Sequence, residues 1–95
     1  MRVTVKGKHM ELTDGLKPYA EKKLGKLEKY FNHIQEVQIT QSLERQWHVV
    51  EVMLQGDGVL LRGEERTADM YASIDQVFEK LERQVQKFKG KRLLR

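Results

Sequence analysis

Lysine and arginine side chains recur at helical spacing in two segments of this 95-residue chain. The bases of the first segment are Lys22, Lys26 and Lys29, and those of the second are Lys80, Arg83, Lys87 and Lys91. Cations about one helical turn apart gather on one side of a helix and can follow a phosphate backbone. The two stripes therefore predict nucleic-acid binding.

The structural alternatives are a solvated helix face and neutralisation by carboxylates. Asp75, Glu79 and Glu82 form an acidic sector on the second helical segment, beside its basic stripe. If the two helices pack in parallel, this acidic sector can face the bases of the first helix. Glu79 and Arg83 can also pair along the helix for a few tenths of a kcal/mol, roughly.

Charge is distributed unevenly along the chain. The formal net charge is +4, yet residues 32–68 hold three bases against six acids, so the remainder is strongly basic. From residue 83 to residue 95 there is no acid; the bases there are Arg83, Lys87, Lys89, Lys91, Arg92 and Arg95. This local basicity favours a polyanionic partner over a merely soluble surface.

Residues suited to catalysis or to metal binding are sparse. The chain has no cysteine, which excludes a disulfide, a thiolate metal site and a thiol nucleophile. The three histidines (His9, His33 and His48) share no metal-ligand spacing, and no glycine-rich phosphate loop follows a strand. The sequence predicts a protein that is not an enzyme and that uses no cofactor, metal or small-molecule substrate. It also predicts a cytoplasmic protein without a membrane partner, because neither a signal peptide nor a long apolar run is present.

The hydrophobic pattern predicts a β-α-β-β-β-α order. Alternation indicates strands over residues 2–7, 37–43, 50–54 and 59–66, with a hairpin turn at 56–58. Helical spacing indicates a helix of about five turns, capped by Thr13 and reaching Phe31, although Pro18 could shift its start. A second helix is predicted from its cap at Asp69 to a stop at Gly90. We have no sequence-based account of Gly25 inside the first helix.

Such an order predicts an α+β two-layer sandwich, with two helices on one face of a four-stranded, mostly antiparallel sheet, similar to double-stranded-RNA-binding domains. Residues 1–95 form a single domain in this interpretation. Val49 and Met53 would lie on the other sheet face. Trp47, at a turn, is either a rim residue or a platform for an unpaired base, whereas Tyr71 is expected to pack against the sheet.

Several segments carry a family resemblance over essentially the whole chain. Residues 69–75 (DMYASID) and 80–84 (KLERQ) resemble the second-helix signature of the ribosome hibernation promoting factors, also called ribosome-associated inhibitors or subunit-interface proteins. Residues 11–16 (ELTDGL) and 26–31 (KLEKYF) are similar to the ends of that family's first helix.

The resemblance implies a factor of stationary phase or stress. It would bind the small ribosomal subunit and its rRNA in the channel of mRNA and of the A- and P-site tRNAs, blocking translation and protecting the idle ribosome. The residues that it implies as RNA-facing are Lys22, Lys23, Lys26, Lys29, Lys80, Arg83, Lys87 and Lys91, and the basic C-terminal stretch adds Lys89 and Arg92.

Three questions stay open at this point. Long family members add a C-terminal dimerisation domain, and the ending of residues 92–95 is compatible with an N-terminal piece of such a form; a homodimer is expected only then. A general double-stranded or structured RNA-binding module is the first functional alternative, although Asp69 stands where such domains carry a lysine cluster. A protein-interaction module that uses the exposed sheet face is the second.

Overall fold

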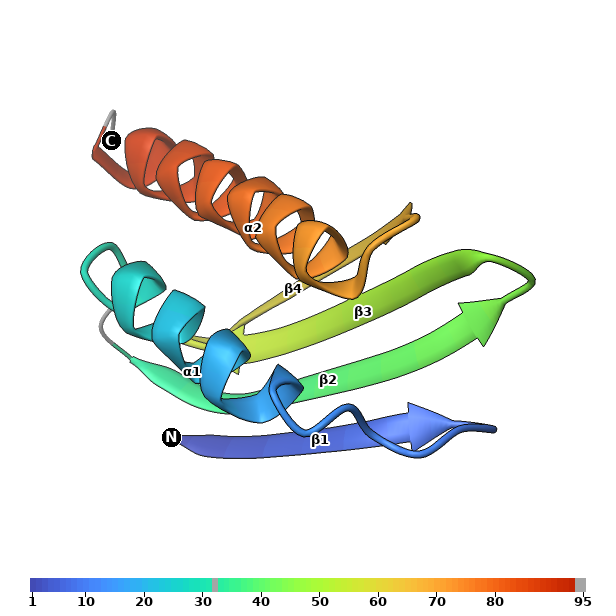
Figure 1. The fold of residues 1–95 in the computed structure, drawn as a ribbon. Coiled ribbons are helices and arrows are strands. Elements are labelled where there is room, and N and C mark those ends of the chain that lie inside the picture. Colours follow the sequence, from blue (N-terminus) through green and yellow to red (C-terminus); the bar gives the residue numbers. More distant parts are fainter. Residues whose placement is uncertain (32, 94–95) are drawn as a thin grey trace.

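The computed structural model describes residues 1–31 and 33–93, with side chains up to Lys87. Its elements are β1 (Arg2–Lys8), α1 (Leu16–Leu27), β2 (Ile34–Glu44), β3 (Trp47–Gly56), β4 (Val59–Thr67) and α2 (Met70–Leu93). The four strands form one sheet in the order β1-β2-β3-β4 (Figure 1). β1 pairs with β2 in parallel, and the other neighbours are antiparallel, as the predicted fold requires.

Both helices lie on the same face of the sheet and run in the same direction (Figure 1). Each helix buries one apolar stripe, which in α1 includes Leu16 and Leu24 and in α2 includes Ile74 and Leu81. The inward residues of the strands, Val37 and its neighbours, complete a single core cluster. In the strands every second side chain is buried, and in α1 and α2 the buried side chains recur about once per helical turn. This pattern confirms the predicted two-layer sandwich.

The first helix begins later than predicted. Gly15 occupies the N-cap position without a side-chain cap hydrogen bond, so Thr13 as the cap is wrong. The fully buried Gln41 of β2 engages Thr13 instead: its Nε2 donates to Thr13 Oγ1 at 3.0 Å, and its Oε1 accepts the Thr13 N–H at 3.3 Å. Pro18 then falls in the first turn, where no N–H is needed. The helix ends at Leu27, and Phe31 is buried beyond it.

The second helix starts as predicted and runs on further. The Ala72 N–H donates to Asp69 Oδ2 at 2.9 Å, which confirms the cap. Gly90 as the stop is wrong, because α2 continues to Leu93. A glycine adopts the right-handed helical backbone as readily as a left-handed one, at a cost of roughly 1 kcal/mol relative to alanine. No helix in the described part of the chain is long and apolar enough to cross a membrane.

The predicted hairpin turn joins β3 to β4. Asp57 and Gly58 have φ angles of 52° and 72°, the two positive values that a type I′ turn requires. Gly56, just before the turn, lies against the carbonyl of His33, and a side chain at this position would overlap that oxygen. This close approach packs the segment before β2 against the end of β3.

Two glycines should respond in opposite ways to substitution by alanine. Gly25 is exposed within α1, and an added methyl group would meet nothing within 4 Å, so Gly25→Ala should stabilise the fold by about 1 kcal/mol. Gly56→Ala should destabilise it, because the methyl group would collide with backbone. Urea unfolding followed by circular dichroism measures both changes. Equal effects of the two substitutions would contradict this account.

Candidate nucleic-acid interface

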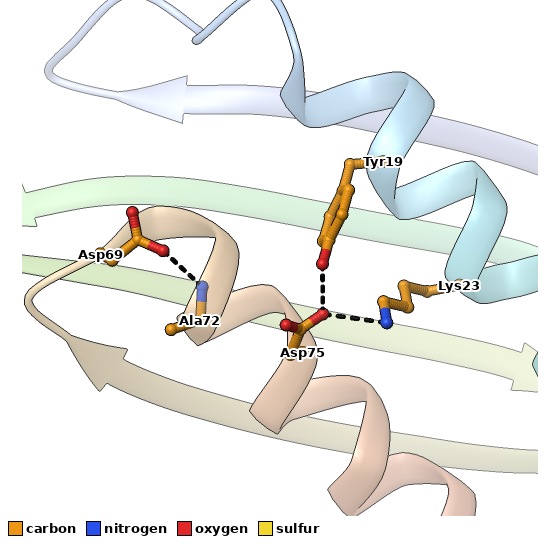
Figure 2. Close-up of polar contacts among 5 residues, drawn as sticks. All are labelled: Tyr19, Lys23, Asp69, Ala72 and Asp75. Atoms are coloured by element: carbon orange, nitrogen blue, oxygen red, sulfur yellow. Dashed lines mark hydrogen bonds and ion pairs between the residues drawn. The ribbon is translucent and has the colours of Figure 1, made fainter.

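A polar network joins α1 to α2 across the helix layer (Figure 2). The hydroxyl of Tyr19 donates to Asp75 Oδ1 at 2.6 Å, and Lys23 Nζ lies 2.9 Å from the same oxygen. The Lys23 ammonium is also 5.4 Å from the centre of the Tyr19 ring, within cation–π range. One carboxylate of α2 is therefore held by two side chains of α1.

The electrostatics of this network favour the ion pair. The hydrogen bond from Tyr19, followed by the one from Lys23, lowers the pKa of Asp75. The hydrogen bond with Asp75 raises the pKa of Lys23, and the same carboxylate raises the pKa of the Tyr19 phenol. Lys23 was predicted to face RNA. In the structure it is instead paired with Asp75 of the same chain.

Tyr71 extends the contact between the helices towards the N-terminal end of α2. Its ring meets that of Tyr19 edge to face, with the ring centres 4.9 Å apart and the planes at 80°. The expectation that Tyr71 packs against the sheet is wrong, because Tyr19 offers an aromatic face from α1. Tyr71 stays 38% exposed.

A small groove of about 140 Å³ follows the network between the helices. Its lining residues are Lys23, Lys26, Leu27, Asp75, Phe78, Glu79 and Glu82. Since α1 and α2 run in parallel, the acidic sector of α2 faces the inner basic flank of α1, as the structural alternative foresaw. The positive charges of the two helices consequently do not merge into one stripe.

Lys80 contacts β4 instead of solvent alone. Its Nζ lies 2.6 Å from Glu65 Oε2 and donates to the backbone oxygen of Glu64 at 3.3 Å. One turn later, Gln84 Nε2 donates to the Arg62 carbonyl at 3.2 Å. These two side chains of α2 occupy backbone acceptors of the edge strand β4, so the charge of Lys80 is largely committed within the domain.

Five of the predicted bases remain exposed, and none of their side chains forms an ion pair or hydrogen bond with another residue whose side chain the structure describes. We call Lys22, Lys26 and Lys29 the α1 lysines, and Arg83 and Lys87 the α2 bases. The helical angle places the α2 bases on the solvent side of α2, between the acidic flank that faces α1 and Lys80, which faces β4. Lys89, Lys91 and Arg92 lie on the last turns of α2, and their side chains are outside the described residues.

Other exposed groups escaped the sequence-based prediction. Lys6 and Lys8 lie on β1 at outward positions, alternating with Val3 and Val5. The alternation of apolar and polar residues over residues 2–7 could have indicated that these lysines lie on the outer face. We used only its valines, to predict the strand. Trp47, the first residue of β3, is 38% exposed at the rim.

The outer sheet face offers little apolar surface at the positions that we singled out. Val49 is only 5% exposed although it lies on that face. Met53 is half-buried, with the Arg62 guanidinium 3.5 Å from its sulfur. Across the described residues, no group of three or more potential metal-ligating side chains comes together.

A family model described as "Sigma 54 modulation protein / S30EA ribosomal protein" matches residues 3–93. The chain belongs to this family. The match covers nearly every residue, and it confirms the resemblance that the helix-end motifs carry.

Named relatives agree with this family. The chain is 44% identical over 92 residues to a ribosome hibernation promotion factor of Lactococcus lactis subsp. cremoris, covering 94% of this chain and 50% of that protein. It is 35% identical over 95 residues to a ribosome hibernation promoting factor of Azotobacter vinelandii, covering 100% of this chain and 89% of that protein. The chain thus spans only half of the first relative.

The fold is also similar to that of a solved relative. The crystal structure of the Thermus thermophilus Protein Y N-terminal domain superposes with a TM-score of 0.84 at 35% sequence identity. The similarity covers 93% of this chain and 99% of that domain. The sheet order and the paired helices described above are therefore those of the family.

The Asp75 network should make stability depend on pH. Because the folded pKa of Asp75 is lowered from 3.8, its contribution should be complete above that value and be lost as the pH falls through the folded pKa. Asp75→Asn should therefore destabilise the protein at pH 7 and do so less at pH 2–3. The measurement is the urea midpoint as a function of pH.

Tyr19→Phe provides the matched control, because it removes the largest cause of the lowered pKa and keeps the ring. Its acid-side loss of stability should be smaller than in the wild type and should be complete at a higher pH, because the folded pKa of Asp75 then lies closer to the unfolded value. A difference between wild type and Asp75→Asn that stays constant from pH 2.5 to pH 7 would contradict this assignment.

Proposed function

We propose that residues 1–95 form the ribosome-binding domain of a hibernation factor. The domain binds the small ribosomal subunit in the channel of mRNA and of the A- and P-site tRNAs, inhibits translation and protects idle ribosomes in stationary phase or stress. The family and the names of its members support the ribosome as the partner. The proposed localisation is the cytoplasm, where ribosomes are.

The observation that carries the proposed binding mode is that some of the predicted bases are ion-paired within the chain and others are not. Lys23 and Lys80 are paired with carboxylates, whereas the side chains of the α1 lysines and the α2 bases are exposed and form no ion pair among the described residues. Of these five, Lys26 lies beside the acidic residues of the interhelical groove. Exposed cations on the helix layer are suited to rRNA phosphates, since each contact releases a condensed counterion. We propose these five residues as the principal RNA contacts, with Lys23 and Lys80 as minor ones, and we retain Lys89, Lys91 and Arg92 as further candidates.

The proposed mechanism is occupation of space rather than catalysis. A domain held in the channel by phosphate contacts excludes mRNA and tRNA from the volume that it fills. The two helices and the sheet form a rigid body around one core, which suits a blocking element. We propose a homodimer only for a protein that adds a C-terminal domain to these residues.

A general duplex-RNA module is less well supported. In α2 the N-terminal position that would carry a lysine cluster holds Asp69, and its carboxylate is occupied by the Ala72 N–H. A carboxylate at this place repels a phosphate backbone. Tight binding to a plain RNA duplex, as strong as to the subunit, would favour this alternative over the channel.

Removing the α2 bases should weaken binding to the small subunit in a salt-dependent way. For Arg83→Gln/Lys87→Gln, each lost phosphate contact should reduce the slope of log affinity against log salt by about 0.7 to 0.9. Lys80→Gln is the matched control, because it removes one charge from the same helix that is already paired with Glu65. The measurement is the dissociation constant for purified 30S subunits over a range of KCl concentrations.

If the control and the double variant lose equal binding free energy per charge removed, the distinction between ion-paired and exposed bases is refuted. The channel is tested separately, by adding mRNA and tRNA as competitors to the bound wild-type protein. Displacement is expected, since the binding sites overlap. Undiminished binding under saturating competitors would refute the channel but leave ribosome binding intact.

A further inference from the structure

The edge strand β1 carries two lysines on the sheet face away from the helices. Val3 and Val5 pack against the core, so Lys6 and Lys8, at the alternate positions, lie on the opposite face. Both lysines are exposed, and neither side chain has an ion pair or hydrogen bond with any residue in the described part of the chain. Residues two apart on a strand are separated by roughly 6.6 Å. Their charges therefore act together.

A shallow hollow of about 510 Å³ adjoins these lysines. Its lining residues are Lys6, Gly7, Lys8, His9, Thr40 and Glu51. Thr40 is the register partner of Lys6 on β2 and adds a hydroxyl donor to the two ammonium groups. Glu51 is the one carboxylate among the lining residues, so the hollow is rich in donors and positive overall.

The backbone at the end of β1 shapes this hollow. Gly7 lies against the carbonyl of Met10, so closely that a side chain would overlap that oxygen. His9 adopts a left-handed backbone with φ 61°, which turns the chain sharply after Lys8. The turn brings His9 to the lining of the hollow beside the lysines.

Elsewhere on the outer sheet face, the other strand bases that the structure describes lie beside an acid or a sulfur atom. Arg66 Nη2 lies 2.9 Å from Glu44 Oε2, and Arg62 contacts the sulfur of Met53. Arg2 stands opposite Glu36 in the β1–β2 register. In the β1–β2 register Lys6 stands opposite Thr40 and Lys8 opposite Ser42, so neither lysine has a carboxylate directly across from it.

We propose that the β1 hollow is a second binding surface for RNA phosphates, on the opposite side of the sheet from the α1 lysines and the α2 bases. This inference rests on the proposed function and deepens it. The domain is then held between two RNA segments, one against the helix layer and one against β1. Lys6 and Lys8 bind the phosphates of the second segment, and Thr40 donates a hydrogen bond.

Lysines on an edge strand have another known use, which is to deter pairing with a second chain. The two roles give different results in one comparison. Lys6→Gln/Lys8→Gln removes two charges that have no partner on the outer face. Arg66→Gln removes a charge on the same face that is already paired with Glu44, and it serves as the control.

The experiment measures binding of the full chain to 30S subunits at several KCl concentrations. We expect Lys6→Gln/Lys8→Gln to weaken binding roughly tenfold at 150 mM salt and to lower the salt slope by about 1.4 to 1.8. Per charge removed, the control Arg66→Gln should change both quantities much less. Circular dichroism and sedimentation establish that each variant is folded and monomeric.

A dissociation constant and slope equal to those of the wild type would overturn the inference, and so would dimers that form with unchanged affinity. If Arg83→Gln/Lys87→Gln still weakens binding in that case, the proposed function stands. Wild-type protein that does not bind 30S subunits would instead refute the proposed function itself.

The chain has no cysteine, so Lys8→Cys gives a unique attachment point for a crosslinker. Crosslinks to rRNA are expected, and crosslinks only to ribosomal proteins would overturn the inference.

Discussion

The arrangement of the helix layer depends on one carboxylate. Asp75 receives the Tyr19 hydroxyl and the Lys23 ammonium, so α2 is tied to α1 at a point above the core. Apolar packing of both helices into one core sets how they lie on the sheet. The hydrophobic effect itself is not directional and does not select which charged flanks meet. The hydrogen bonds to Asp75 are directional, and they fix the pairing of an acidic flank with a basic one.

This pairing determines which charges face outwards. The acids of α2 that line the interhelical groove attract the inner side of α1, and Lys80 turns to the edge of β4. What remains for a partner is two separate groups of cations on the helix layer. A divided surface of this kind suits a folded RNA with several phosphate ridges better than a single straight duplex. Net charge alone, at +4, would not have indicated this division.

Patterns that depend on near neighbours in sequence predicted much of the structure. Strand alternation, the helix stripes, the Asp69 cap and the Gly58 turn all arise from contacts within a few residues, and all are confirmed. The start of α1 was mispredicted because the partner of Thr13 is Gln41, 28 residues away. No local rule identifies such a partner.

The candidate interface shows the same limit. The two outward stripes were visible from spacing, but the internal pairing of Lys23 with Asp75 and of Lys80 with Glu65 depends on how the layers pack. Spacing predicted that the helix bases are exposed. It could not predict which of them form ion pairs with carboxylates. Lys6 and Lys8 were missed for a different reason, because in a strand the polar positions are usually regarded as simple solvent contacts.

The parallel pairing of β1 has a consequence for how the molecule is assembled. β1 completes one side of the sheet, yet it comes first in the chain, and a parallel neighbour cannot be reached by a tight turn. Until β2 has been synthesised and α1 has packed across the sheet, β1 has no partner. Conversely, a protein shortened by its first eight residues would leave the backbone N–H and C=O groups of β2 open along an apolar strand, a template on which further copies would aggregate.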